Sequence, residues 1–525
     1  SSQSPPPPLS PSPSLPRSPS PTKKSSARDA FAFVHAQELD DPSCWRLPGH
    51  QPESPPLSPS LRRPPSPPMK SSAREEHPPD ERARVPARAA SSIKAPPRGK
   101  GPAGPRQVGT TRKAAQPPRR SVPPAAPKVP PAAPEVPSVH GHGPHGPTAA
   151  QRKLVPQAVA LLTDEAPCAL FYDLDQLRAT LGSISAAFPP TATHAIAMKA
   201  NPLAACLVIA RDLGMGCEVA SPAELEHALR LGFVPERIVF DSPAKTRRDL
   251  RRALASGVRL NADNLEELER IDRILAEVYG GGGPRGLGSC TSRSIGVRVN
   301  PQLGEGGIAA TGTVAPTSKF GVALAEARLQ LLAAYRRYAW LSCVHVHVGS
   351  QGCPLDLLVE GAHAVLHLAK EINDHVGSRQ VRVLDLGGGL PVDYASDAPD
   401  AAVPERLTMA RYAHALREKV PEAFDETRWT LLTEFGRFVH AKCGLMLSTI
   451  EYVKSAGGRR IATVHCGADL FLRTCYQPEA WPHRVSAWGA DGRFLDPDAA
   501  QCDTWDVVGP LCFRGDIIAA ARQLP

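Results

Sequence analysis

The chain has 525 residues, with 61 Lys and Arg, 52 Asp and Glu, and a formal net charge of +9. Residues 1–150 contain 37 of the 58 prolines and 21 basic against 10 acidic residues, whereas residues 151–525 contain 40 basic and 42 acidic residues. The positive charge therefore belongs to the N-terminal segment, and the remainder has no excess charge that would call for a nucleic acid or an anionic membrane as partner.

We expect residues 1–150 to be a disordered, low-complexity tail, because they are too poor in apolar side chains to offset the entropy lost on ordering. The tail repeats itself at an offset of 46 residues: SPSL at 12–15 returns at 58–61, and KSSAR at 24–28 returns at 70–74. The copies lack an amphipathic period, which favours a duplicated flexible segment over a solenoid. Its PxxP stretches could bind a proline-recognising domain, although a plain linker is the simpler interpretation.

Cysteine usage and hydropathy bear on the cellular compartment. The twelve cysteines are scattered without CxxC spacing, which favours free thiols in a reducing compartment. No apolar run reaches the roughly 18–20 residues that span a bilayer, so no membrane partner is expected. An Arg- and Ser-rich leader is also typical of transit peptides. We expect the cytoplasm or the stroma of a plastid or other organelle, with targeting left open because the chain begins at Ser1.

From about residue 151, short apolar runs alternate with amphipathic helical stretches. The expected strands are, in chain order, CALFY (168–172), HAIAM (194–198), CEVAS (217–221), RIVFD (237–241), VRLNA (258–262), SIGVRVN (294–300), WLSCVHVHV (340–348), VRVLDL (381–386) and WTLLT (429–433). Helical stretches such as PAELEHALRLG (222–232), with Pro in its first turn and Gly at its end, separate most of them. This alternation predicts an α/β fold, a parallel (β/α)8 barrel of TIM type over residues 168–440.

After about residue 440 the helical pattern fades. The segments LSTIEYVKSAGGRRIATVHCG (447–467), HRVSAWG (483–489) and TWDVVGPLCF (504–513) predict antiparallel strands. Residues 151–167 and 441–525 are therefore expected to form a smaller β-rich domain.

Chemically useful residues follow several of the expected barrel strands. They are Lys199, His347, Gly387–Gly389, Glu434 and Arg437. Barrel enzymes carry their active sites at this end of the strands, so these residues are expected to meet at one mouth.

Taken singly, each of these residues has a plain structural explanation. A lysine at a strand end is commonly a solvated charge, and His345 and His347, which share one strand face, could be hydrogen-bonded core histidines. A glycine run can be a simple turn, as we expect for Gly280–Gly283, which follows a helix rather than a strand.

Together, the same residues have one consistent use. A lysine amine can form a Schiff base with an aldehyde cofactor, and a glycine loop after a strand can bind a phosphate through its N–H groups. A carboxylate such as Glu434 can keep a pyridine nitrogen protonated, and a histidine ring can stack on the pyridine. The set predicts a site for pyridoxal 5'-phosphate.

From about residue 165 to its end, the chain resembles the barrel-type (fold type III) pyridoxal-phosphate decarboxylases that act on ornithine, arginine and diaminopimelate. The matching motifs are, in order, AMKANP (197–202), RVNPQ (298–302), SKFG (318–321), HVGSQ (347–351), GGGLP (387–391), EFGR (434–437) and GPLCFRGD (509–516). EFGR has Phe435 where the family usually has proline.

The resemblance implies a role for each motif residue. Lys199 would carry the cofactor as a Schiff base, His347 would stack on its ring, and Glu434 would hold the ring N–H. The phosphate contacts would come from Ser350, Gly387, Gly388, Gly389 and Arg437, with Arg437 also able to meet a substrate carboxylate. Glu218 and Glu224 would lie near the Schiff base. No metal is expected.

The resemblance also implies how substrate is handled. After loss of CO₂, Cys512 would protonate the carbanion, or guard the site while Lys199 does so. Since the motif cysteine acts in the partner subunit's site, a head-to-tail homodimer with shared active sites is implied. The residues expected to contact a small amino-acid substrate are Arg298, Arg473, Tyr476 and Asp516.

Two departures concern the substrate. Diaminopimelate enzymes generally carry an acidic residue just after the motif cysteine, where this chain has Phe513, and an Arg-Pro-x-x-Tyr run, where it has the shorter Arg473-Thr-Cys-Tyr476. The stretches NPQLGEGGI, SKFGV and EFGR still resemble the diaminopimelate branch more than the ornithine branch. We therefore expect a diaminopimelate decarboxylase-like enzyme of lysine biosynthesis, with an ornithine-, lysine- or arginine-type decarboxylase of polyamine metabolism as alternative.

A further departure is the end of the sequence at Pro525. The family continues with further strands and a Gly-Ala-Tyr tyrosine that contacts the cofactor. We expect a fragment or truncated chain, and weak cofactor binding if the chain is complete.

Other function classes remain open. They are an alanine-racemase-like enzyme, a catalytically impaired relative that binds a partner protein, and a scaffold protein that acts through its tail. An impaired relative would be expected to lose Lys199 or Cys512, yet both are present.

Overall fold

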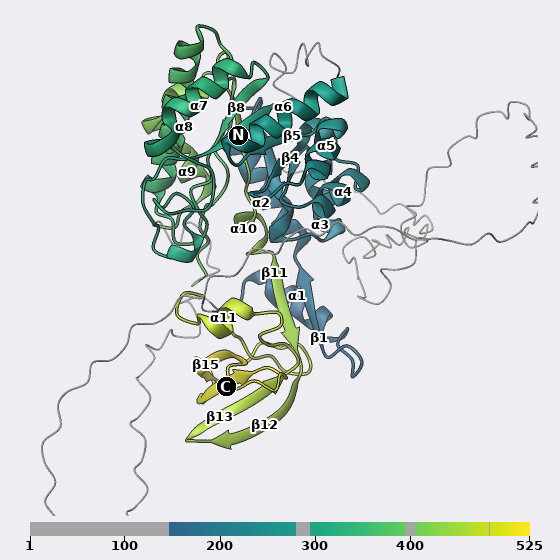
Figure 1. Cartoon of the computed structure of the whole chain (residues 1–525). Helices are drawn as coiled ribbons and strands as arrows, with labels where there is room; N and C mark the ends of the chain where they lie inside the picture. The colour runs from purple at the N-terminus through teal and green to yellow at the C-terminus, as the bar shows by residue number, and fades with distance from the viewer. Residues whose placement is uncertain (1–145, 280–293, 395–404, 482) are drawn as a thin grey trace, which may run out of the picture. The chain divides into compact units, whose positions relative to one another are not determined.

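A computed structural model describes residues 146–279, 294–394, 405–481 and 483–525 of the chain (Figure 1). Most of the predicted tail, its 46-residue duplication and its proline motifs lie outside these residues, as does the Gly280–Gly283 run. No helix within the described ranges is both long enough and apolar enough to cross a membrane.

Parallel strands form a closed barrel. Its strands are β2 (Thr193–Ala197), β3 (Gly216–Val219), β4 (Ile238–Asp241), β5 (Arg259–Ala262), β6 (Ile295–Asn300), β8 (Leu341–His345), β9 (Val383–Asp385) and β10 (Thr430–Thr433). They follow the order β5-β4-β3-β2-β10-β9-β8-β6, and pairing of β5 with β6 closes the circle; the short β7 (Val322–Ala323) also pairs with β6. The predicted eight-stranded barrel is confirmed.

Amphipathic helices alternate with the barrel strands, as Figure 1 shows. They are α2 (Leu174–Ala187), α3 (Ala204–Asp212), α4 (Pro222–Arg230), α5 (Arg247–Ser256), α6 (Leu265–Tyr279), α7 (Leu324–Arg337), α8 (Leu355–Val376) and α9 (Met409–Lys419), followed by the short α10 (Arg437–His440). Short 3-10 helices are η3 (Met198–Ala200), η4 (Pro235–Arg237), η7 (Ala309–Thr311) and η9 (Pro421–Phe424).

Local sequence signals set the ends of these helices. In α5, Thr246 and Asp249 form a reciprocal capping box, and Gly257, with φ of +74°, ends the helix in the left-handed conformation. Its apolar face buries Leu250 and Leu254 in the main core, which also contains the helix-facing side chains of the strands.

The remaining strands form two antiparallel or mixed sheets. β1 (Cys168–Tyr172) pairs antiparallel with β11 (Gly444–Ser448), so the CALFY run lies outside the barrel. A four-stranded sheet has the order β12 (Ile450–Ala456), β13 (Arg459–Val464), β14 (Asp503–Val508) and β15 (Ile517–Leu524). The helices α1 (Ala149–Val159) and α11 (Leu472–Tyr476) accompany these strands, and α1 covers much of the 151–167 segment that we expected to be β-rich.

Two strand predictions for this part are wrong. β13 and β14 pair in parallel rather than antiparallel, because the long connection between them, which contains α11, returns the chain to the same end of the sheet. HRVSAWG forms no strand: it makes one isolated bridge, from Trp488 to Phe494, across a tight turn stabilised by the hydrogen bond from Gly489 N to Arg493 O.

Candidate active site

Lys199 and Glu218 form an ion pair at the C-terminal ends of neighbouring barrel strands. Lys199 lies in η3, directly after β2, and its Nζ donates to Glu218 Oε1 at 2.7 Å and Oε2 at 2.6 Å. Burial lowers the pKa of Lys199, but the charges of Glu218, Glu434 and Asp241 outweigh it and raise that pKa above its usual value. Burial raises the pKa of Glu218, against the opposing effect of the ammonium. The Lys199 side chain is nevertheless 49% exposed, so it borders solvent, while its Nζ lies against the fully buried Glu218 carboxylate.

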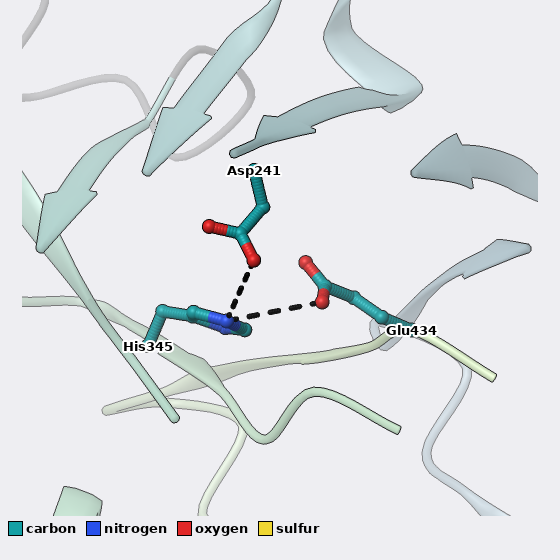
Figure 2. A group of neighbouring side chains, drawn as sticks. All are labelled: Asp241, His345 and Glu434. Atoms are coloured by element: carbon teal, nitrogen blue, oxygen red, sulfur yellow. Dashed lines mark ion pairs between the residues drawn. The ribbon is translucent and has the colours of Figure 1, made fainter. Parts of the chain in front are cut away.

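A buried group of charged residues lies beside this pair (Figure 2). His345, the last residue of β8, has Nδ1 3.0 Å from Asp385 Oδ2 and Nε2 3.5 Å from Asp241 Oδ2 and 3.9 Å from Glu434 Oε2. Arg298 on β6 donates to the same Asp241 oxygen at 2.8 Å. The strands β4, β6, β8, β9 and the end of β10 thus bring their polar residues to one point.

The glycine loop holds His347 in a defined state. Gly388 N–H donates to His347 Nδ1 at 3.2 Å, so the ring proton of the neutral histidine lies on Nε2. Burial, together with the nearby cations Arg298 and Lys199, lowers the pKa of His347 well below its usual value. The ring is therefore a fixed, neutral imidazole.

The same loop approaches neighbouring backbone closely. A Cβ at Gly387 would collide with Val346 O, one at Gly388 with Glu434 O, and one at Gly389 with Gly349 O. Gly387 N–H donates to Asp385 Oδ1 at 3.0 Å. Since Gly387 and Gly388 both donate to protein atoms, the expected phosphate contact depends on Gly389 and on neighbouring side chains.

Arg437 at the start of α10 connects three segments of the chain. Its Nε donates to Ser350 Oγ at 3.1 Å, its Nη1 donates to Tyr394 Oη at 3.1 Å, and its guanidinium lies 4.7 Å from the centre of the Trp481 ring. Arg437 and Ser350, which were expected to bind phosphate together, are therefore in direct contact.

Other predicted residues have structural partners. Both oxygens of Asp516 accept backbone N–H groups, from Ala468 at 2.5 Å and Leu511 at 2.8 Å. Glu224 accepts the N–H of Ala220 at 2.6 Å, at the start of α4. Arg298, expected to contact substrate, is buried, and its guanidinium also lies 4.4 Å from the Phe320 ring.

Of the C-terminal residues expected to contact substrate, Arg473 and Tyr476 are exposed, whereas Asp516 is buried. Tyr476 stacks on Phe513 with ring centres 5.6 Å apart and an angle of 18° between planes. Arg473 lies 5.0 Å from the Trp481 ring, and Cys512, beside Phe513, is exposed. The structure thus joins the two departures from the family pattern, at 473–476 and at Phe513, in one aromatic contact.

The sequence did not lead us to select three members of the buried group as site residues: Asp241, Asp385 and His345. Asp241 and Asp385 end the buried strands β4 and β9, so the strand-end rule that selected Lys199 would also have found them. His345 was considered only as a core histidine.

The residues present fit the predicted cofactor. Lys199 offers an amine on a half-exposed side chain, and among the described residues Glu434 Oε1 is buried without a hydrogen-bond partner, as a group that awaits a ring N–H would be. The neutral His347 and the crowded glycine loop border the same place.

Comparisons with known proteins agree with this fit. Residues 174–441 match the family "Pyridoxal-dependent decarboxylase, pyridoxal binding domain". The diaminopimelate decarboxylase of Pseudomonas aeruginosa is 32% identical over 335 residues, which cover 62% of this chain and 72% of the relative. That of Bacteroides thetaiotaomicron is 26% identical over 362 residues, covering 67% and 85%.

Solved structures show the same likeness. The diaminopimelate decarboxylase from Helicobacter pylori, complexed with L-lysine, has a TM-score of 0.59 and 25% identity, covering 70% of this chain and 84% of that one. The lysine/ornithine decarboxylase from Vibrio vulnificus, complexed with putrescine, has a TM-score of 0.56 at 20% identity, covering 72% and 89%, and shares the fold.

Proposed function

Since the chain belongs to the pyridoxal-dependent decarboxylase family, with pyridoxal phosphate as its cofactor, we propose that it is a diaminopimelate-type decarboxylase. The observation that carries this proposal is the half-exposed Lys199, whose Nζ Glu218 holds at the barrel mouth, within electrostatic reach of Glu434 and His347. The relatives that it matches over most of their length are diaminopimelate decarboxylases, which supports this substrate class.

The residues of the chain divide the work of the site. When bound, pyridoxal phosphate supplies an aldehyde that takes up an amine and a ring that withdraws electrons. Lys199 would provide the attaching amine, and Glu434 would hold a proton at the ring nitrogen. His347, fixed by Gly388, would present the face of its ring, while Arg437 and Ser350 would bind the phosphate.

The distal end of the substrate would meet an unusual surface. We assign Tyr476 and Phe513 to this end, where an acidic residue would otherwise receive a distal amine. Their stacked rings offer no carboxylate that could bind a distal ammonium group. Recognition of the distal end would instead fall to Arg473, which could pair with the second carboxylate of the substrate.

The cysteines bear on both the assembly and the compartment of the protein. Cys512 is exposed, and we assign it to the active site of a partner subunit in a homodimer, where it would donate a proton. The ten described cysteines are all free, which supports a reducing compartment such as the cytoplasm or an organelle stroma.

Release of CO₂ from a panel of substrates tests the proposal. The protein is incubated with pyridoxal phosphate and L-, D- or meso-diaminopimelate, ornithine, lysine or arginine, with a Lys199→Ala variant as control. We expect CO₂ from a diaminopimelate isomer and none from the variant. Release from ornithine or arginine alone would contradict the substrate class, and racemisation without CO₂ would contradict decarboxylation itself.

A further inference from the structure

His345 lies between carboxylates on both sides of its ring. Nδ1 faces Asp385 on β9, and Nε2 faces both Asp241 on β4 and Glu434 after β10, as Figure 2 shows for the latter two. The ring is fully buried, with a relative exposure of 0%. A neutral imidazole has one N–H and can satisfy only one side, whereas an imidazolium donates from both nitrogens.

If His345 is neutral, the buried carboxylates of this region outnumber its cations. Four buried carboxylates meet here, and two of them have other cations: Lys199 pairs with Glu218, and Arg298 pairs with Asp241. Among the described residues, the Asp385 carboxylate accepts hydrogen bonds from two neutral donors, Gly387 N and Asn261 Nδ2, each at 3.0 Å. His345 Nδ1 lies 3.0 Å from the same carboxylate, as an ion pair rather than a well-aligned hydrogen bond. Among the described residues, the basic side chain within ion-pair distance of the Glu434 carboxylate is His345, whose Nε2 lies 3.9 Å from Oε2. A buried carboxylate without a cation is costly, so a positive ring is favoured.

We propose that His345 retains both ring protons and that its positive charge favours the ionised form of Glu434, which makes His345 a positioning residue for the cofactor. The inference rests on the proposed function, because an ionised Glu434 matters only if it holds a proton on the pyridine nitrogen. Asp385 orients the imidazolium and, through Gly387 N–H, joins it to the glycine loop.

The pKa of His345 shifts in the direction that this arrangement requires, whereas the net pKa shift of Glu434 runs toward the neutral carboxyl. Burial lowers the pKa of His345, but Asp385, Glu434 and Asp241 outweigh it and raise that pKa well above the usual value. Burial and the nearby carboxylates raise the pKa of Glu434 well above normal, and His345 is the cation that opposes this rise. Two further basic groups lie close to this cluster: His347, whose pKa His345 helps to lower, and Arg298, which pairs with Asp241.

A metal ion is the alternative source of positive charge. Single atoms of Asp241, His345 and Glu434 lie within 4.8 Å of one another, a spacing that could accommodate an ion. The Asp241 oxygen that faces the ring already accepts from Arg298 at 2.8 Å, and an ion would have to displace the Nε2 proton. The proton is therefore the simpler cation.

The test compares His345→Gln with His194→Gln. His194 is also buried, but its Nδ1 lies 2.9 Å from the neutral hydroxyl of Thr433, so its replacement removes a buried ring without removing a charge. The holoenzyme is prepared with pyridoxal phosphate labelled at the pyridine nitrogen, and nitrogen NMR reports whether that atom is protonated. We expect a protonated nitrogen in the wild type and in His194→Gln, and a shift toward the unprotonated resonance in His345→Gln near neutral pH.

Activity gives a second readout. In His345→Gln, kcat should fall at least about tenfold, with a smaller change in KM, because protonation of the pyridine nitrogen acts on the chemical step. If that variant does not fold, Asp385→Asn replaces it: His345 then loses its proton more easily, so the nitrogen resonance should become pH-dependent above neutral pH.

Two outcomes would overturn the inference: an unchanged, protonated resonance in His345→Gln, or one equivalent of Zn²⁺ bound by the wild type and lost in that variant. The NMR measurement uses cofactor without substrate, so it distinguishes failure of this inference from failure of the substrate assignment.

Discussion

At the scale of single residues, two lysine–carboxylate pairs of the barrel differ in the burial of the lysine. Lys245 pairs with Glu267 at 3.0 Å, also donates to Asn261 O at 2.9 Å, and has a side chain of 0% exposure. Lys199 pairs with the equally buried Glu218, but half of its own side chain is exposed. Lys245 thus ties the segment after β4 to β5 and α6, whereas Lys199 borders solvent, which is why we assign the structural role to Lys245 and the reactive one to Lys199.

The Lys199–Glu218 pair predicts a pH effect. Glu218 holds the pKa of Lys199 above its usual value, so the amine is protonated, and unreactive toward an aldehyde, over a wide range below that pKa. Glu218→Gln removes the charge, burial then lowers the pKa, and the neutral amine appears at lower pH.

The rate at which the visible absorbance of bound cofactor appears, measured against pH after mixing with pyridoxal phosphate, should therefore show its midpoint at lower pH in Glu218→Gln. A midpoint that does not move would show that Glu218 does not control the amine.

At the scale of elements, the conformation and close packing of the loop after β9 depend on residues without side chains. Gly387 has φ of +63°, a left-handed conformation that favours glycine, and a Cβ there would collide with Val346 O. Gly377, the C-cap of α8, has φ of +76° but open space around a Cβ. The two positions therefore share a conformation and differ in crowding.

Alanine at these two glycines separates conformation from crowding. Gly377→Ala should lower the free energy of unfolding by about 1–2 kcal/mol, the cost of a left-handed residue. Gly387→Ala should cost roughly 1–3 kcal/mol more, because the backbone must move to make room. It should also weaken pyridoxal phosphate binding, since the loop positions His347. Chemical denaturation and cofactor titration measure both effects, and equal results for the two variants would argue against the crowded loop.

The elements also show what the sequence could predict. The barrel was predictable because its strands are short buried runs with amphipathic helices between them, and Lys199, His347 and Glu434 were found because each follows such a run. The parallel pairing of β13 with β14 was not, since alternation within a strand carries no information on its distant partner. Asp241 and Asp385 satisfy the same strand-end rule, but their contacts with His345 arise where strands far apart in sequence meet, so the pairing itself could not be predicted.

At the scale of the whole molecule, the barrel residues do not include the expected proton donor. Cys512 lies near the end of the chain on an exposed patch with Phe513 and Tyr476. An exposed apolar patch that carries a motif cysteine is suited to an interface, which is why we assign it to the partner's active site in a homodimer.

Mixed dimers test this assignment. Lys199→Ala and Cys512→Ser should each lose most activity alone, because every site lacks one residue. When the two variants are co-expressed, random pairing gives mixed dimers in half of the assemblies, and each has one complete site if the sites are shared. About a quarter of wild-type activity should return. If no activity returns although mixed dimers are isolated, Cys512 does not act across subunits.

The central claim is that Lys199 is the amine that holds the cofactor, and its most direct test is chemical mapping. The protein loaded with pyridoxal phosphate is reduced with borohydride, which makes the linkage permanent, and is then digested and analysed by mass spectrometry. The account predicts the pyridoxyl group on the peptide that contains Lys199, at close to one per chain, and none on the peptide with the equally paired Lys245. A label on Lys245, or spread over surface lysines with Lys199 unmodified, would contradict it.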